Sequence, residues 1–192
     1  MKVFKFGGAS VNNIERIHMV GKILKQLNDE KLLIVISAMG KTTNALEKVV
    51  EAFYGGKKEE SLQLFQLVKN QHLVTAKQLL VTHYLACEEQ LKNFFTEAEW
   101  LLHDDPQKPF DYYYDQVVCI GELLSTTIVS FYLNEIGIKN KEHNNSYDER
   151  INDAKHQISK LLEDIEIGIQ RKNLKVMESN DQHRYARKVS YF

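Results

Sequence analysis

The chain has 192 residues, of which 43% are hydrophobic and 27% charged, an ordinary composition for a globular domain with its own core. Its formal net charge is -1 at pH 7, so no overall positive charge favours nucleic acid as a partner. We expect a cytoplasmic protein without a membrane partner, because no apolar run is long enough to cross a bilayer and Lys5 interrupts the apolar N-terminus. Cys87 and Cys119 lie far apart in apolar segments, and we expect both to be reduced thiols.

The N-terminal part of the chain predicts a strand, a helix and a second strand. Apolar and basic residues alternate over residues 3–6, and two glycines end this strand. A helix follows, with Asn12 or Asn13 as its cap. Residues 32–36 are continuously apolar, which is typical of a strand buried on both faces of a parallel sheet.

The middle of the chain predicts helices only. Residues 44–54 form the first of them. Residues 57–103 contain neither proline nor glycine, and their apolar spacing predicts two long antiparallel helices that turn near His83. A single long apolar helix is expected over residues 111–136, with Gly137 as its C-terminal cap.

The first candidate site follows the first strand and reads Lys5-Phe-Gly-Gly-Ala-Ser10. Adjacent glycines let backbone N–H groups approach an anion, and the N-terminus of a following helix adds its dipole. A lysine beside such a loop supplies a point charge for a phosphate. By itself the motif favours an ordinary strand-to-helix turn, because short glycine motifs are common.

The second candidate follows the buried strand and reads Ser37-Ala-Met-Gly-Lys-Thr-Thr43. It is not a P-loop, because Val35 stands where that motif requires a glycine, five residues before Gly40. What remains is a hydroxyl-rich loop at the carboxyl end of a parallel strand, where open α/β sheets bind ligands. The alternative interpretation of Thr43 is a simple N-cap of the next helix.

The third candidate lies in the long apolar helix and reads Gly121-Glu-Leu-Leu-Ser-Thr126. A glycine inside a helix costs about 1 kcal/mol, so Gly121 indicates the close approach of another group. Glu122 would need a cationic partner if buried, and the spacing equally allows a partly exposed glutamate on the polar edge of the helix. The histidines show no metal-binding spacing, so no metal site is predicted.

Together, these three stretches resemble the beginning of an aspartate kinase, in their order and in the helical hairpin between the second and the third. The resemblance covers residues 1–138. It implies an α/β fold, namely part of the αβα sandwich of amino-acid kinases, with parallel strands and a long helical hairpin insertion. It also implies transfer of a phosphoryl group from ATP, with Mg2+, to the β-carboxylate of L-aspartate, the first step in lysine, threonine and methionine biosynthesis.

The resemblance further implies roles for single residues. Phosphate or nucleotide binding falls to four residues of the first motif: Lys5, Gly7, Gly8 and Ser10. Lys5 would be the catalytic cation. Ser37 and Thr43 would lie on the aspartate and phosphate side of the pocket, and Glu122 would pair with the α-ammonium of the substrate. Such roles suit phosphoryl transfer, in which catalysis depends on positioning and electrostatic stabilisation.

The chain also departs from the family. Ala9 replaces a usual threonine, and Cys119 and Thr127 replace more polar residues near the third motif. Residues 139–192 do not read as the family's next segment, so we expect a kinase part over residues 1–138 and a divergent tail that reflects truncation or a frameshift.

The expected function is therefore that of an aspartate kinase that is inactive as this chain alone, because the segments for the adenine and for the α-carboxylate of aspartate are not found. The alternative is a non-catalytic fragment that acts at most as a binding module. An incomplete sandwich would leave an apolar surface uncovered, so self-association is expected.

Overall fold

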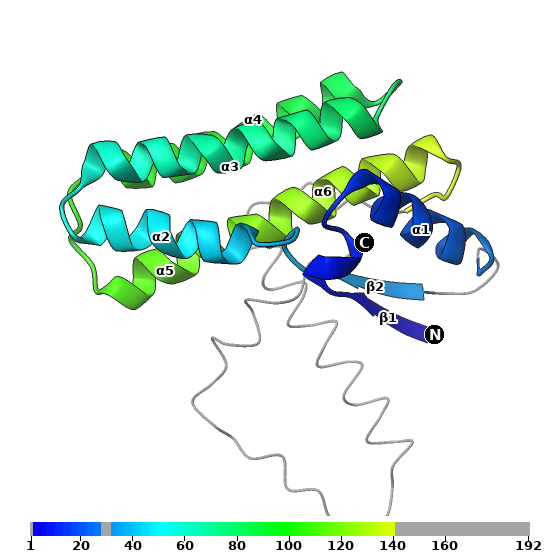
Figure 1. Ribbon diagram of the computed structural model, residues 1–192, viewed down its shortest axis with the longest axis horizontal. Helices are drawn as coiled ribbons and strands as arrows, with labels where there is room; N and C mark the ends of the chain where they lie inside the picture. Colours follow the sequence, from blue (N-terminus) through cyan, green and yellow to red (C-terminus); the bar gives the residue numbers. More distant parts are fainter. Residues whose placement is uncertain (1, 28–31, 141–192) are drawn as a thin grey trace, which may run out of the picture.

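The computed structural model describes residues 2–27 and 32–140. In chain order its elements are β1 (Lys2–Phe6), the 3-10 turn η1 (Gly8–Ser10), α1 (Ile14–Lys25), β2 (Leu32–Ile36), α2 (Thr42–Tyr54), α3 (Lys58–Leu79), α4 (Tyr84–His103), α5 (Phe110–Val118) and α6 (Ile120–Glu135). Figure 1 shows α1 and α6 on one face of the small sheet, while α2 to α5 extend away from it. The tail expected from residue 139 onward lies almost entirely outside the described residues.

The two strands form a parallel sheet, as the sequence predicts. Phe6 is aligned with Ile36, and both side chains belong to the hydrophobic core under the helices. Because side chains alternate along a strand, Val3 and Lys5 point to the opposite face of the sheet, where both are exposed. The helices therefore cover one face of β1, and its other face carries Lys5.

The N-terminus of α1 confirms one of the two expected caps. Asn13 has an extended backbone, and its side chain accepts a hydrogen bond from the N–H of Arg16 at 2.9 Å. This satisfies one of the helix N–H groups that has no partner within the helix. Asn13 rather than Asn12 is therefore the capping residue.

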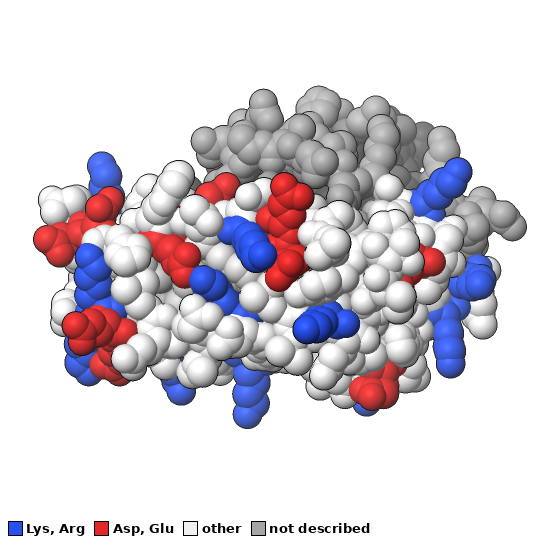
Figure 2. Space-filling model, turned by 90° about the horizontal axis from the view of Figure 1, so that it is seen from above, with Lys and Arg blue, Asp and Glu red and all other residues white. Residues whose placement is uncertain are grey.

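The long helices α3 and α4 form the expected antiparallel hairpin. Inside it, the rings of Phe65 and Phe95 pack edge to face with centroids 6.2 Å apart. Its outer surface, seen from above in Figure 2, mixes acidic and basic side chains without a continuous patch of one sign. The turn lies at residues 80–83, where the sequence predicts it.

The carboxylate of Glu135, at the end of α6, holds this turn. It accepts hydrogen bonds from the backbone N–H groups of Val81, Thr82 and His83 at 2.8, 3.2 and 3.1 Å. Burial alone would raise the pKa of this carboxyl, but the bonds from the three N–H groups and the His83 side chain lower it overall. The local sequence pattern gave no sign of this contact.

The expectation of one helix over residues 111–136 is wrong, because α5 and α6 are separate helices that meet at Cys119. The N–H groups of Glu122 and Leu123 both donate to the carbonyl of Cys119, at 3.1 and 3.3 Å. This shared acceptor tightens the first turn of α6 in the manner of a 3-10 turn. Neither Cys119 nor Cys87 forms a disulfide bond in the part of the chain that the structure describes.

The C-terminus of α6 confirms the predicted glycine cap. Gly137 has a φ of 85°, a left-handed conformation that favours glycine. Its N–H donates to Asn134 O at 3.0 Å, and the N–H of Ile138 donates to Leu133 O at 2.8 Å. These two bonds form a Schellman motif, and Ile138 is buried against the core behind it.

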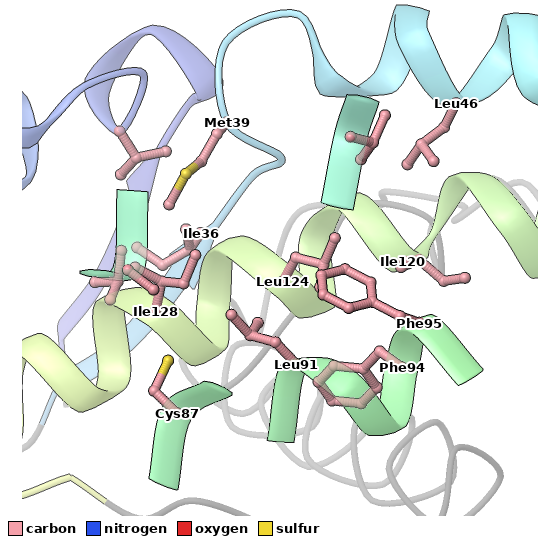
Figure 3. Close-up of a cluster of buried hydrophobic side chains, with 14 of the residues drawn as sticks. Ile36, Met39, Leu46, Cys87, Leu91, Phe94, Phe95, Ile120, Leu124 and Ile128 are labelled. Carbon is pink, nitrogen blue, oxygen red and sulfur yellow. The ribbon is translucent and has the colours of Figure 1, made fainter. Parts of the chain in front are cut away.

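The stretch Phe110–Glu135 also corrects the expectation that no apolar run is long enough for a bilayer. An 18-residue window within it has a mean hydropathy of 1.5, yet 78% of that window is buried inside the protein. Figure 3 shows Leu124 and Ile128 of this stretch among core side chains that include Ile36 and Leu91. The stretch therefore has the burial of a core helix, and its hydropathy is weak support for a membrane span.

Candidate functional site

The first two motifs meet at the carboxyl ends of the strands (Figure 1). Because β1 and β2 are parallel, the loops that follow them leave the same edge of the sheet. The N–H of Ser37 donates to Phe6 O at 3.0 Å, and the N–H of Gly40 donates to Gly8 O at 3.1 Å. These bonds fix the glycine turn against the loop that follows β2, and we call this meeting point, with Gly121 of α6, the strand-end junction.

Gly8 is the residue at which the two loops approach most closely. A Cβ atom at Gly8 would lie 2.5 Å from the carbonyl oxygen of Ala38, which is too short for any real contact. Gly7 differs, because a Cβ there would have no atom within 4 Å and its φ of -70° suits any residue. Packing therefore requires glycine at Gly8, whereas Gly7 borders open space.

Gly121 brings α6 against the other side of the same loop. A Cβ atom there would lie 3.0 Å from Ala38 Cβ and 3.2 Å from Thr42 Cγ2. The sequence predicted a close approach at this position, and the structure confirms it. Ala38 is thus held between Gly8 and Gly121, which joins all three motifs.

A hydroxyl group adds a second link between α6 and the loop. Ser125 is fully buried, and its Oγ lies 2.9 Å from Ser37 O and 3.0 Å from Glu122 O. Ser125 belongs to the third motif, whose sequence pattern assigns it no role. Its position three residues after Glu122 in an apolar helix is the only local signal that could have drawn attention to it.

Glu122 lies in the first turn of α6 and is only 8% exposed. The interpretation as a partly exposed glutamate is therefore wrong. The dipole of the helix stabilises a carboxylate in its first turn, and a buried carboxylate suits a cationic group as its partner. The position is compatible with binding an ammonium group.

The interpretation of Thr43 as an N-cap is also wrong. Helix α2 begins one residue earlier, at Thr42, and Lys41 occupies the cap position without a side-chain hydrogen bond. Thr43 is half-buried in the first turn of α2. Thr42, which the sequence analysis did not single out, is 2% exposed, and its Oγ1 has no hydrogen-bond partner among the described residues.

Only some residues of the first motif lie beside the second and third motifs. The N–H of Ser10 donates to Gly7 O at 2.8 Å, which closes η1, and its side chain is half-buried. Lys5 is exposed on the face of the sheet opposite the helices and forms no ion pair with another described residue. The structure thus joins the glycine turn to the loop of Ser37 and to α6, while Lys5 is exposed on the sheet face away from the helices.

The described residues do not fit a magnesium site of their own. No group of three or more His, Cys, Asp or Glu side chains that could hold a metal ion occurs in residues 2–27 and 32–140. Glu122 is the carboxylate at the strand-end junction, among hydroxyl and backbone groups. Mg2+ is commonly bound through one or two carboxylates and the phosphates of the substrate, so it would have to be held mainly by a nucleotide.

The comparisons with known protein families and with curated proteins agree with each other. The sequence matches the sequence model of the amino acid kinase family over residues 1–173. It is 36% identical over 149 residues to chloroplastic aspartokinase 2 of Arabidopsis thaliana, and this match covers 73% of this chain and 26% of that protein. Chloroplastic aspartokinase 1 of the same plant is 34% identical over 151 residues, covering 73% of this chain and 25% of the relative. The chain therefore spans about a quarter of the length of these curated relatives.

Solved structures show the same fold. Aspartokinase III of E. coli, in complex with lysine and aspartate, matches with a TM-score of 0.62 and 22% identity, covering 72% of this chain and 30% of that chain. The same enzyme with aspartate and ADP matches with a TM-score of 0.60 and 22% identity, covering 71% and 29%. The α/β class that the sequence predicted is confirmed, whereas the division into residues 1–138 and 139–192 stays a prediction.

Proposed function

Because the chain belongs to the amino acid kinase family, we propose that it carries the aspartate and phosphate side of an ATP-dependent aspartate kinase. The observation that carries this proposal is the strand-end junction, where Ala38 lies between Gly8 and Gly121. That packing brings the buried Glu122 next to a loop rich in hydroxyl groups. The resemblance to aspartokinases supports aspartate as the substrate of this arrangement.

The glycine turn and Lys5 would bind the phosphate that is transferred. Gly7 borders open space, so a phosphate oxygen can approach the backbone of the turn there. Lys5 stands at the carboxyl end of β1, and its long side chain can bring a positive charge to the end of the sheet. The half-buried Ser10 would add a hydroxyl group beside them. These groups would offset the negative charge that develops during transfer.

The second and third motifs would bind the amino-acid substrate. Glu122 would pair with the α-ammonium group, since a buried carboxylate favours a cation. Ser37 and Thr43 would donate hydrogen bonds from the loop and from the first turn of α2, whose helix dipole also favours an anionic group. The substrate β-carboxylate would then face the phosphate held by the glycine turn.

The proposal includes ATP, and Mg2+ that arrives with the ATP phosphates. Aspartokinase III of E. coli has been solved with aspartate and ADP, and we extend nucleotide binding to this family member by resemblance. Since the chain spans about a quarter of its curated relatives, we expect no turnover from the 192-residue chain alone. The second candidate function, a non-catalytic binding module, is the same site without the chemical step.

Two further expectations belong to this proposal. The charge and composition of the chain support a cytoplasmic location, although the plant relatives are named as chloroplastic proteins. Self-association is supported by the exposed face of β1, where Val3 is 54% exposed.

Binding measurements on matched variants test the proposed site. Glu122→Gln should weaken L-aspartate binding at least about tenfold, because it removes the charge opposite the ammonium group. Glu51→Gln, at an exposed position on α2, should leave it unchanged. Lys5→Ala should weaken Mg-ATP binding, whereas Lys22→Ala on the exposed face of α1 should not. Calorimetry that shows equal effects in each pair would contradict the proposed site.

A hydroxamate assay separates the two candidate functions. We expect no aspartyl phosphate from the 192-residue chain alone. Turnover that disappears in Lys5→Ala would overturn this expectation and would support the catalytic role of Lys5.

A further inference from the structure

We propose that Ser125 is a positioning residue, which holds Glu122 of α6 in register with the loop that carries Ser37 and Thr43. The role concerns the geometry of the chain itself. It rests on the proposed function only for the identity of the ligand that this geometry would serve.

The hydroxyl group of Ser125 connects two distant parts of the chain. Its Oγ is 2.9 Å from the carbonyl oxygen of Ser37, which lies 88 residues earlier, and 3.0 Å from the carbonyl oxygen of Glu122. A serine hydroxyl has one proton, so it donates to one of these oxygens at a time or is shared between them. The loop and the first turn of α6 are thus linked through a single group that is fully buried.

The contact makes the peptide groups around Ser37 part of a continuous structure. The N–H of Ser37 donates to Phe6 O of β1 at 3.0 Å, and its carbonyl oxygen accepts a hydrogen bond from the hydroxyl group of Ser125. One residue is therefore fixed to the sheet on one side and to α6 on the other. Loss of the hydroxyl would leave the carbonyl oxygen of the half-buried Ser37 without this donor.

The bond of Ser125 to the carbonyl oxygen of Glu122 would by itself indicate only an ordinary structural role. Serines inside helices commonly donate to a carbonyl one turn earlier, and such bonds have no functional meaning. The bond to Ser37 is different, because it leaves the helix and reaches the loop of the second motif. Together with the packing of Gly121 on Ala38, it fixes both the distance and the rotation of α6 relative to that loop.

The chain offers a matched control on the same helix. Ser130 is 2% exposed, and its hydroxyl donates to Asn140 Oδ1 at 2.7 Å. Removing either hydroxyl deletes a hydrogen bond that links α6 to a residue outside the helix. Only Ser125 touches the loop of the second motif, so a general loss of packing would affect both variants alike.

Hydrogen exchange measured by mass spectrometry on the full 192-residue chain tests the proposal. Ser125→Ala should accelerate exchange in residues 37–43 by about fivefold, the effect of one ordinary hydrogen bond, and leave residues 58–79 unchanged. Ser130→Ala should leave residues 37–43 at the rate of the unmodified protein. Equal acceleration of residues 37–43 in both variants, or none in either, would overturn the proposal.

A second variant and a second measurement complete the test. Ser125→Cys keeps a weak donor of similar volume, so it should accelerate the same residues less, and it decides the question if Ser125→Ala fails to fold. Titration with L-aspartate should show about fivefold weaker binding for Ser125→Ala and no change for Ser130→Ala. If the unmodified chain binds no aspartate but the exchange pattern holds, the proposed function fails and the positioning role stands.

Discussion

The strand-end junction and the turn of the α3–α4 hairpin both join distant parts of the chain, but they are held by different forces. At the junction, Ala38 lies between Gly8 and Gly121, and the bonds are formed by backbone and hydroxyl groups without charge. At the turn, the carboxylate of Glu135 accepts hydrogen bonds from three backbone N–H groups. The first contact depends on shape, and the second on an ionised group.

This difference separates two kinds of sensitivity within one small protein. The packing of Ala38 between Gly8 and Gly121 should respond to side-chain volume. The hairpin should respond to pH, because it contains a buried histidine, His72, and because its turn is bonded to the ionised Glu135 of α6.

The largest expected effect is that of volume at Gly8. Gly8→Ala should lower the free energy of unfolding by about 3 kcal/mol, because the new Cβ would stand 2.5 Å from a backbone oxygen and only a backbone shift can relieve the contact. Urea denaturation followed by circular dichroism measures this change.

Gly7→Ala is the control for the same substitution in the neighbouring residue. It should change stability by less than about 0.5 kcal/mol, since its Cβ meets nothing and its φ is allowed. Similar losses in the two variants would mean that the junction is not fixed by shape.

The contrast between local and distant contacts also explains how much the sequence could predict. The cap at Asn13, the parallel strands, the hairpin and the glycine at Gly137 follow from patterns within a few residues, and the structure confirms them. The break at Cys119 was missed, because residues 111–136 have no proline, and their one interior glycine, Gly121, was taken to mark a close approach of another group rather than an interruption of the helix. Hydrophobic spacing reports the buried face of a helix but not a local change in its hydrogen bonds.

The candidate site was predictable to the same extent. Gly121 could be read from the cost of a glycine in a helix, without knowing that Ala38 and Thr42 are its neighbours. The roles of Ser125 and Glu135 could not, because their partners lie 88 and 52 to 54 residues away. The fold decides which segments meet, and one sequence alone does not contain that pairing in any local pattern.

The second prediction concerns the buried histidine of the hairpin. Burial lowers the pKa of His72 below its ordinary value of 6.5, and the hydrogen bond of its Nδ1–H to Val68 O at 2.7 Å opposes this only in part. As the pH falls below 6.5, the unfolded chain takes up a proton at His72 and the folded chain does not. Stability should therefore fall by up to about 1.4 kcal/mol per pH unit in this range.

Replacing His72 tests this directly. His72→Leu removes the titrating group, so chemical denaturation between pH 5 and 7 should show a flatter dependence of stability on pH than in the unmodified protein. His103→Gln changes an exposed histidine of α4 and should keep the original slope. An unchanged slope in His72→Leu would show that His72 does not cause the dependence of stability on pH.

The smallest expected effect is that of Glu135, and it falls in a different pH range. The pKa of Glu135 is lower in the folded chain than its ordinary value of 4.5, so its contribution is complete above 4.5 and is lost as the pH falls through the lower folded value. Glu135→Gln should cost about 1 kcal/mol at pH 7, comparable to the loss of a helix cap, and progressively less as the pH falls below 4.5. Glu89→Gln, at an exposed position on α4, should cost nothing in this pH range.

Since the three N–H donors lie between α3 and α4, hydrogen exchange should rise at residues 80–84 in Glu135→Gln and stay unchanged at residues 37–43. If residues 37–43 also exchange faster, the turn and the junction are coupled, and the separation of a charge-held region from a shape-held one would fail.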